Sequence, residues 1–241
     1  MKIKVLILLL IVISCQSQIK RYKWSGVLDS GNIIRNVVQY IPEDTCIVTD
    51  YDGNCYDTVH IGTQIWLKQN LKVMHYNNGD VIHYEEDFNI WRSLTIGGFC
   101  HYGNNYANVS IYGEIYNWNA INDPRGIAPT GWHVATVSDW AVLSNYLGGD
   151  SIAGGKLKEV GTEHWDSPNT GATDEYGFKA LPGGYRDENG TFGGRFLLGI
   201  WWAYGGGLLN ESIREIYWVY AELRLESVLK RYGLSVRCIK D

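Results

Sequence analysis

Residues 128–149, APTGWHVATVSDWAVLSNYLGG, contain the clearest secondary-structure signal of the 241-residue chain. Thr136 is a good N-cap, and Asp139 three residues later completes a capping-box pattern. An apolar face at helical spacing follows, made of Trp140, Leu143, Tyr146 and Leu147. Gly148 and Gly149 are typical of a helix end. The stretch predicts a helix between Thr136 and Gly148.

On both sides of this helix, some segments have apolar residues at helical spacing and others have the alternating apolar and polar residues of a strand. Upstream, the spacing within residues 112–119 predicts a second helix that breaks at residues 122–124, and residues 153–160 form a third, short helical segment. Apolar and polar residues alternate over residues 59–67, 216–221 and 233–239, as in half-buried strands. Two main helices surrounded by short strands predict an α+β domain with long loops.

Composition excludes several classes of protein. A hydrophobic fraction of 45% is too high for a disordered chain. The 28 Gly, 10 Trp and 17 Tyr argue against a coiled coil or helical bundle. A net charge of -5 provides no basic surface for nucleic acid, so we expect no nucleic-acid partner.

The N-terminus has the pattern of an export signal. Lys2 and Lys4 precede a short apolar run over residues 5–13, which is well below the roughly 20 residues of a bilayer-spanning helix. Residues 12–15, VISC, resemble the bacterial lipoprotein box, which implies cleavage after Ser14 and lipid attachment to Cys15. A buried N-terminal strand is the competing interpretation. We expect a signal peptide over residues 1–14, a tether over 15–45, and a membrane partner through the lipid anchor.

If Cys15 carries lipid, four cysteines remain for two disulfides in an oxidising compartment: Cys46, Cys55, Cys100 and Cys238. Four cysteines allow three pairings. A two-residue turn at residues 52–53 would place Cys55 opposite Asp50 and put Cys46 beyond disulfide reach, whereas a longer loop would permit a Cys46–Cys55 bond.

No set of residues predicts a metal, a cofactor or a catalytic group. Residues 50–54, DYDGN, resemble the start of a calcium loop, but Gly53 and Ile61 occupy the wrong positions for an EF-hand. A plain turn is expected, and a calcium site of another type is the alternative. The six His form no H-x-H or H-E-x-x-H motif, and His133 is expected to tie its loop to the core. The glycine runs lack the lysine and the strand–helix context of a phosphate-binding loop.

A group of aromatic residues late in the chain is the candidate ligand surface. Aromatic rings stack on the apolar faces of sugars while their polar tips donate hydrogen bonds, although a role in the core explains the same rings more readily. The candidate contacts are Trp202, Tyr204, Tyr217, Trp218 and Tyr220.

An ordered series of uncommon motifs over residues 46–241 resembles the Fibrobacter succinogenes major paralogous domain. The motifs include VHIGTQIW at 59–66, YGEIYNW at 112–118, NDPRG at 122–126, APTGWHV at 128–134, LPGGYR at 181–186 and GLSVRC at 233–238. The chain departs from the family pattern over residues 203–227, a stretch that is a divergent ligand loop or simple drift.

This resemblance implies a C-type-lectin-like fold, with two helices on a small twisted antiparallel sheet and long ordered loops. It implies export or lipid anchoring in Gram-negative bacteria, and a Cys100–Cys238 disulfide that would leave Cys46 with Cys55. Formylglycine-generating relatives of the superfold need a pair of cysteines in their C-terminal part, whereas this C-terminal half has only Cys238. The family has no established biochemical role.

We therefore expect a non-enzymatic cell-envelope lipoprotein, placed at the outer membrane, whose lectin-like domain over residues 46–241 recognises a glycan or protein ligand. The alternative is a structural or adhesin subunit of a surface assembly.

Overall fold

The computed structural model describes residues 22–25, 37–40, 46–205 and 210–241, and the chain divides into two units between residues 45 and 46. In the first unit, β1 (Tyr22–Ser25) and β2 (Val37–Tyr40) pair antiparallel. Cys15 and the predicted signal peptide lie outside the described residues. None of the helices in the described ranges is long and apolar enough to cross a bilayer.

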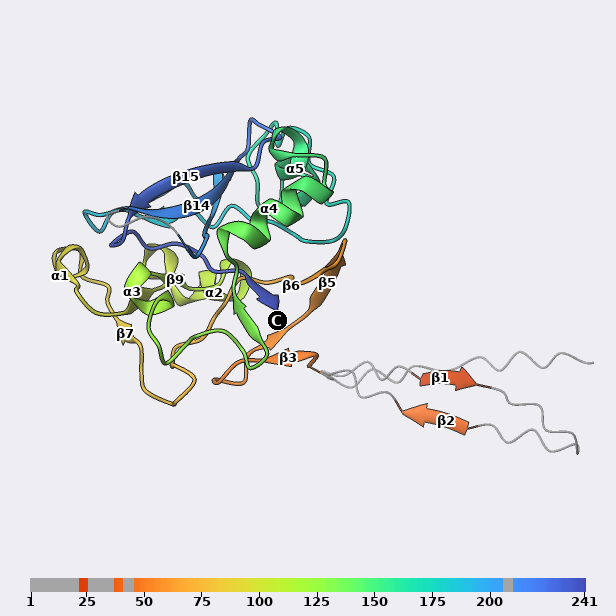
Figure 1. The fold of residues 1–241 in the computed structure, drawn as a ribbon, viewed down its shortest axis with the longest axis horizontal. Helices are drawn as coiled ribbons and strands as arrows, with labels where there is room; N and C mark the ends of the chain where they lie inside the picture. The colour runs from red at the N-terminus through yellow and green to blue at the C-terminus, as the bar shows by residue number, and fades with distance from the viewer. Residues whose placement is uncertain (1–21, 26–36, 41–45, 206–209) are drawn as a thin grey trace, which may run out of the picture. The chain divides into compact units, whose positions relative to one another are not determined.

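A four-stranded antiparallel sheet has the order β10-β16-β6-β5 (Figure 1). The late strand β16 lies inside this sheet, since it pairs with β10 on one side and with β6 on the other. The β5–β6 hairpin confirms the alternation predicted over residues 59–67. The strands are β5 (Thr58–Ile61), β6 (Gln64–Leu67), β10 (Trp132–Val134) and β16 (Cys238–Lys240).

The remaining described strands form smaller sheets, and all their pairs are antiparallel except β7–β8. One three-stranded sheet contains β13 (Leu198–Trp202), β14 (Asn210–Tyr217) and β15 (Arg224–Leu229). Another contains β7 (His83–Tyr84), β8 (Gly98–Cys100) and β9 (Ile115–Tyr116). Two-stranded pairs are formed by β3 (Val48–Thr49) with β4 (Cys55–Tyr56), and by β11 (Tyr185–Arg186) with β12 (Phe192–Gly193). The predicted mixed α+β class, with small and mainly antiparallel sheets, is confirmed.

Helix α4 (Val137–Tyr146) confirms the principal helix prediction. Both halves of the capping box form: Asp139 N–H donates to Thr136 Oγ1 (3.1 Å), and Thr136 N–H donates to Asp139 Oδ2 (2.8 Å). Gly148 and Gly149 follow with φ of 102° and 98°, which ends the helix as expected. The predicted apolar face is wrong at Tyr146, whose side chain is 53% exposed.

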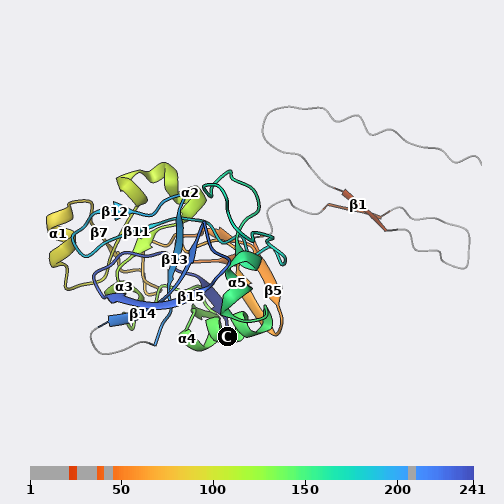
Figure 2. The ribbon, with the colours of Figure 1, turned by 90° about the horizontal axis from the view of Figure 1, so that it is seen from above.

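Helix α5 (Asp150–Leu157) lies beside α4 (Figures 1 and 2) and begins three residues before the predicted segment. An added Cβ would not fit at either glycine of this helix: at Gly154 it would meet the backbone of Ala221 and Glu222, and at Gly155 the backbone of Gly171. Gly155 N–H donates to Ala221 O at 2.8 Å. These glycines let the helix approach the β14–β15 connection.

The helix predicted over residues 112–119 is wrong. Gly113 has a φ of 75° and packs against Asn70 and Leu71, which interrupts helical backbone there. The chain instead forms two short helices separated by β9, namely α2 (Val109–Tyr112) and α3 (Trp118–Ile121). A further helix, α1 (Phe88–Ser93), and the 3-10 turns Tyr102–Asn104 and Tyr106–Asn108 complete the described helical segments.

The predicted C-terminal strands are only partly correct. The strand predicted over residues 216–221 ends at Tyr217, because Trp218 and Tyr220 belong to a turn. Within residues 233–239, only Cys238 and Ile239 are in a strand, while Leu234 and Ser235 make isolated bridges.

Tryptophan dominates the core. Six Trp side chains are less than 2% exposed: Trp66, Trp91, Trp140, Trp165, Trp201 and Trp202. Trp66, Trp140 and Trp201 belong to one cluster with Phe178, while Trp202 belongs to a neighbouring cluster with Trp118. The aromatic excess therefore serves mainly to build the fold of a loop-rich domain.

A polar knot joins early, middle and late segments inside this core. Asn70 Oδ1 accepts hydrogen bonds from Trp201 Nε1 (2.8 Å) and from Arg237 Nε (2.7 Å). Asn70 Nδ2 donates to Tyr112 O at 2.7 Å. We call Asn70, Trp201 and Arg237 the Asn70 knot. All three are buried, so each hydrogen bond replaces one that water would otherwise make.

The cysteine pairing agrees with the resemblance at one of the two implied bonds and differs at the other. A Cys46–Cys55 disulfide forms with Cα atoms 5.3 Å apart. Thr49 lies opposite Cys55, so the hairpin loop is longer than the two-residue turn that disfavoured this bond. The expected Cys100–Cys238 disulfide is absent: both are free, and they lie in different core clusters. Burial raises the pKa of the Cys100 thiol to about 12, so this thiol is protonated at neutral pH.

Candidate functional site

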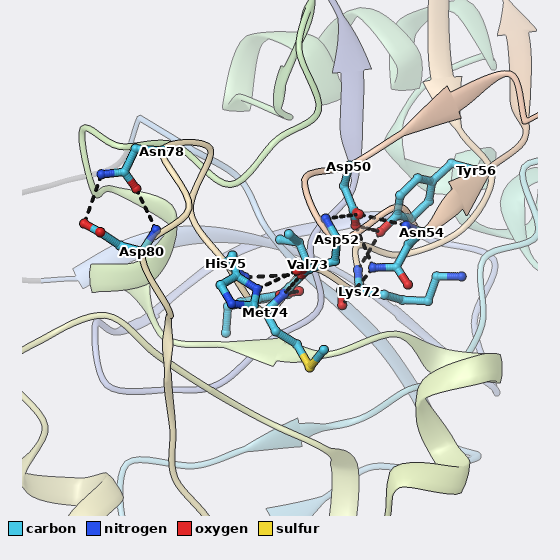
Figure 3. Close-up of polar contacts among 11 residues, drawn as sticks. Asp50, Asp52, Asn54, Tyr56, Lys72, Val73, Met74, His75, Asn78 and Asp80 are labelled. Atoms are coloured by element: carbon cyan, nitrogen blue, oxygen red, sulfur yellow. Dashed lines mark hydrogen bonds and ion pairs between the residues drawn. The ribbon is translucent and has the colours of Figure 1, made fainter.

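The DYDGN segment forms a hydrogen-bonded turn rather than a cation loop (Figure 3). Asp50 Oδ1 accepts backbone N–H groups of Asp52 and Asn54, both at 3.0 Å. Its Oδ2 accepts from Asn54 Nδ2 (2.9 Å) and Tyr56 OH (2.6 Å). Protein donors therefore surround the carboxylate that a calcium ion would need. Among the described residues, no group of His, Cys, Asp or Glu could hold a metal.

Asp52 fastens this turn to the next segment. Its Oδ2 accepts the Met74 N–H at 2.5 Å, and its Oδ1 lies 2.5 Å from Nδ1 of His75 (Figure 3). These contacts set the position of the 74–80 segment, which forms one side of a groove.

The groove is an open hollow of about 540 Å³ with a largely apolar lining. Asn77 links the 74–80 segment to the 126–134 loop, which lines the groove. Its N–H donates to Gly126 O and its Nδ2 donates to Ala128 O, both at 2.9 Å. We call this hollow the Tyr204 groove. The lining residues are Asn77, Ile121, residues 126–134, Thr136 and Tyr204.

Tyr204 contributes an exposed aromatic ring that is held in place. The ring stacks on Trp118, with centroids 5.3 Å apart and an interplanar angle of 16°. Its hydroxyl donates to Asn122 Oδ1 at 2.8 Å, and its backbone N–H donates to Ala135 O at 2.9 Å. The side chain nevertheless remains 37% exposed. A ring fixed in this way loses little conformational entropy when a ligand stacks on it.

His133 provides a titratable group in the same lining. Its Nδ1 lies 2.7 Å from Asp241 Oδ1, and its Nε2 lies 3.1 Å from Asp139 Oδ2. Burial by itself opposes protonation, but the hydrogen bonds to Asp241 and Asp139 outweigh it and raise the pKa of His133. His133 therefore ties its loop to the start of α4 and to Asp241, and not to the core as expected, because the ring is 41% exposed.

A second hollow, of about 450 Å³, adjoins the first and shares Asn77, Thr130 and Trp132 with it. It is lined on its other side by residues 47–51 of the disulfide-bonded hairpin. Half-buried Trp132 therefore contributes to both hollows. Together they offer apolar rings beside amide, hydroxyl and imidazole groups, which is a lining suited to binding.

The candidate ligand residues do not lie together. Trp202 is fully buried, and its Nε1 donates to Tyr116 O at 2.8 Å, so its assignment as a ligand contact is wrong. Only Tyr204 lines the groove.

The other three candidates surround the turn that follows β14. The carbonyls of Tyr217, Trp218 and Tyr220 accept hydrogen bonds from buried Lys158 Nζ at 3.2, 3.4 and 2.9 Å. Tyr217 and Trp218 are half-buried against the core, and Tyr220 is 51% exposed. Burial lowers the pKa of Lys158 to about 8, and this ammonium organises the turn.

Sequence reasoning missed most of the groove. Trp132 and Pro129 line the groove and lie in the APTGWHV motif. That motif indicated the family but did not indicate that these residues lie at the surface. The sequence feature that pointed toward the groove is the predicted end of a helix at residues 122–124. Irregular connections of this kind lie at the surface and often contribute to binding sites.

In a comparison with protein-family models, the model described as the Fibrobacter succinogenes major domain matches residues 59–240. Comparisons with curated proteins and with solved structures give no match. The match covers most of the chain, including β16, Asn70 and the 126–134 loop of the Tyr204 groove.

Proposed function

We propose that this chain, which belongs to the Fibrobacter succinogenes major domain family, is a non-enzymatic binding protein of the bacterial cell envelope. Its domain would have a C-type-lectin-like fold and recognise a glycan at the Tyr204 groove. The observation that carries the proposal is the exposed Tyr204 ring, held by Trp118 and Asn122 at the edge of an apolar hollow.

The chemistry of the lining favours a sugar over a purely apolar ligand. Tyr204 and Trp132 supply ring surface for the apolar face of a sugar. Thr130 supplies a hydroxyl group for sugar hydroxyls. A rim of this kind also discriminates among ligands, since an unmatched polar group is costly to desolvate.

The cellular location rests on the sequence. The VISC motif supports lipid attachment at Cys15, and therefore anchoring to a membrane, which we place at the outer membrane. Replacing Cys15 with Ser would release the protein from the membrane fraction if this assignment is correct.

A glycan array with the purified protein tests the binding proposal, followed by titration of the best ligand. We expect Tyr204→Ala to weaken binding by about tenfold or more, because the stacking surface is lost. Tyr220→Ala is the matched control, since Tyr220 is more exposed but lies at the Lys158 turn; it should change affinity by less than about twofold.

Two outcomes would contradict the proposal. Binding to no glycan would reject recognition of sugars, and a loss confined to Tyr220→Ala would place the ligand at the turn. Crosslinking in intact cells that captures a defined protein complex, with no glycan bound, would favour the alternative of a structural or adhesin subunit.

A further inference from the structure

Arg237 is a buried cation whose hydrogen bonds go only to neutral oxygens. Its side chain is fully enclosed, with the residue 1% exposed. The acceptors are Asn70 Oδ1 (2.7 Å), Leu67 O (2.7 Å), Phe178 O (3.1 Å) and Lys179 O (3.0 Å). A charge removed from water is costly unless an opposite charge lies close to it. Burial lowers the pKa of Arg237 to about 9, partly opposed by Asp174.

This guanidinium lines a small cavity of about 130 Å³, which has room for only a few water molecules. The cavity is lined by Asp57, Lys68, Gln69, Asn70, Ile111, Lys179, Leu181 and Arg237. Three of these side chains are cationic and one is a carboxylate. The carboxylate, Asp57, is exposed at the surface and accepts a hydrogen bond from Gln69 Nε2 at 3.0 Å.

The nearby carboxyl of Asp174 does not neutralise this charge by direct contact. Asp174 Oδ1 instead accepts the backbone N–H of Lys179 at 2.8 Å. Burial raises the pKa of Asp174, which disfavours its charged form. Among the residues that line the cavity, three cations (Lys68, Lys179 and Arg237) lie with the single carboxylate of Asp57.

We propose that this cavity binds a small oxyanion: a phosphate, a sulfate or the carboxylate of an acidic sugar. Such an anion would bring negative charge close to Arg237, whose hydrogen-bond acceptors are all neutral, and would accept charge-assisted hydrogen bonds from Lys68 and Lys179. The site is separate from the Tyr204 groove, because the two linings share no residue. Failure of glycan binding at the groove would leave this proposal intact.

Thermal unfolding with increasing anion, at ionic strength held constant with chloride, tests the site. Inorganic phosphate, sulfate and glucuronate are the three arms. We expect a saturable rise in Tm for at least one arm, because a ligand of the native state alone stabilises it in proportion to RT ln(1 + [L]/Kd). A response to glucuronate alone would assign the site to acidic sugars, and a response to phosphate or sulfate alone to inorganic oxyanions.

The decisive variant is Lys68→Gln combined with Lys179→Gln, which should raise the Kd for the anion by about tenfold or more. This change keeps the Asn70 knot, since Lys179 contributes only its backbone carbonyl to Arg237. Arg92→Gln combined with Lys240→Gln is the control: it also removes two positive charges, here from exposed residues that do not line the cavity, and should keep the wild-type Kd.

An independent readout is the Nε–H resonance of Arg237 in ¹⁵N-resolved NMR spectra, which should shift saturably with the same Kd. An unsaturable rise in Tm that is equal in both double variants would be a general salt effect and would overturn the proposal. So would an Arg237 resonance that does not respond to any of the three anions.

Discussion

Trp201 and Tyr204 are three residues apart, and each donates a 2.8 Å hydrogen bond to an asparagine side-chain oxygen. Trp201 donates to Asn70 and is fully buried, whereas Tyr204 donates to Asn122 and is 37% exposed. One pair holds segments of the domain together, and the other holds a ring at the edge of a groove. Burial, rather than residue type or hydrogen-bond geometry, separates a residue that builds the fold from one that is available to a ligand.

The difference follows from what competes with each hydrogen bond. Inside the core, no water replaces a lost partner, so the unpaired group keeps its full desolvation cost. At the surface, water takes over the lost hydrogen bond at little cost. Equal distances therefore correspond to unequal contributions to stability.

Of the substitutions that test this comparison, Asn70→Ala should change the free energy of unfolding most. It leaves the buried Trp201 Nε1–H, the Arg237 Nε–H and the Tyr112 carbonyl without their partner, and should lower the free energy of unfolding by about 3 kcal/mol. Asn122→Ala is the matched change at the surface and should cost less than about 0.5 kcal/mol. Urea denaturation measures both. Equal losses for the two variants would show that burial does not separate these pairs.

Removing the hydrogen-bond donor of each pair, Trp201 or Tyr204, should give a smaller difference in stability between the buried and the exposed pair, in the same direction. Trp201→Phe loses the hydrogen bond and part of the buried ring, and should cost about 2 kcal/mol. Tyr204→Phe loses only an exposed hydroxyl and keeps the stack on Trp118, so its stability should change by less than about 0.5 kcal/mol. Thermal or urea unfolding at one pH suffices; a loss at Tyr204 as large as that at Trp201 would contradict the comparison.

The smallest effect should appear at His133, and only as a dependence on pH. Its raised folded pKa means that its interaction with Asp139 and Asp241 is complete below the pKa of about 6.5 of an unfolded histidine, and is lost as pH rises through the folded value. The ring is 41% exposed, so solvent screening limits the contribution to less than about 1 kcal/mol.

Wild-type protein should therefore lose stability relative to His133→Gln between pH 6 and pH 8, measured by urea unfolding at each pH. His60→Gln, at an exposed position in β5, is the control and should follow the wild type. A difference between wild type and His133→Gln that is constant over this range would show that protonation of His133 does not contribute.

The sequence was sufficient where local signals and tertiary structure agree. Thr136, Asp139 and Gly148 delimit α4 through hydrogen bonds and backbone geometry that operate within a few residues. The family motifs likewise led to the family, and the β5–β6 hairpin follows from simple alternation.

Prediction failed where partners distant in the sequence decide the structure. Gly113 interrupts the expected helix because it packs on Asn70 and Leu71. Trp202 resembles Tyr204 in sequence context, yet it is enclosed by the core around Trp118. The Tyr204 groove brings together Asn77, the 126–134 loop and Tyr204, and no local pattern encodes that meeting.

The placement of β16 has a consequence for the order of events during biosynthesis. This strand lies between β10 and β6, and Arg237 beside it reaches Leu67, which is 170 positions earlier in the chain. Until residues 237–240 have emerged, β10 and β6 lack their shared neighbour and the Asn70 knot lacks its cation. A domain closed by such long-range contacts folds late and slowly. The nascent chain therefore cannot complete the β10-β16-β6 arrangement by folding from its N-terminal end alone.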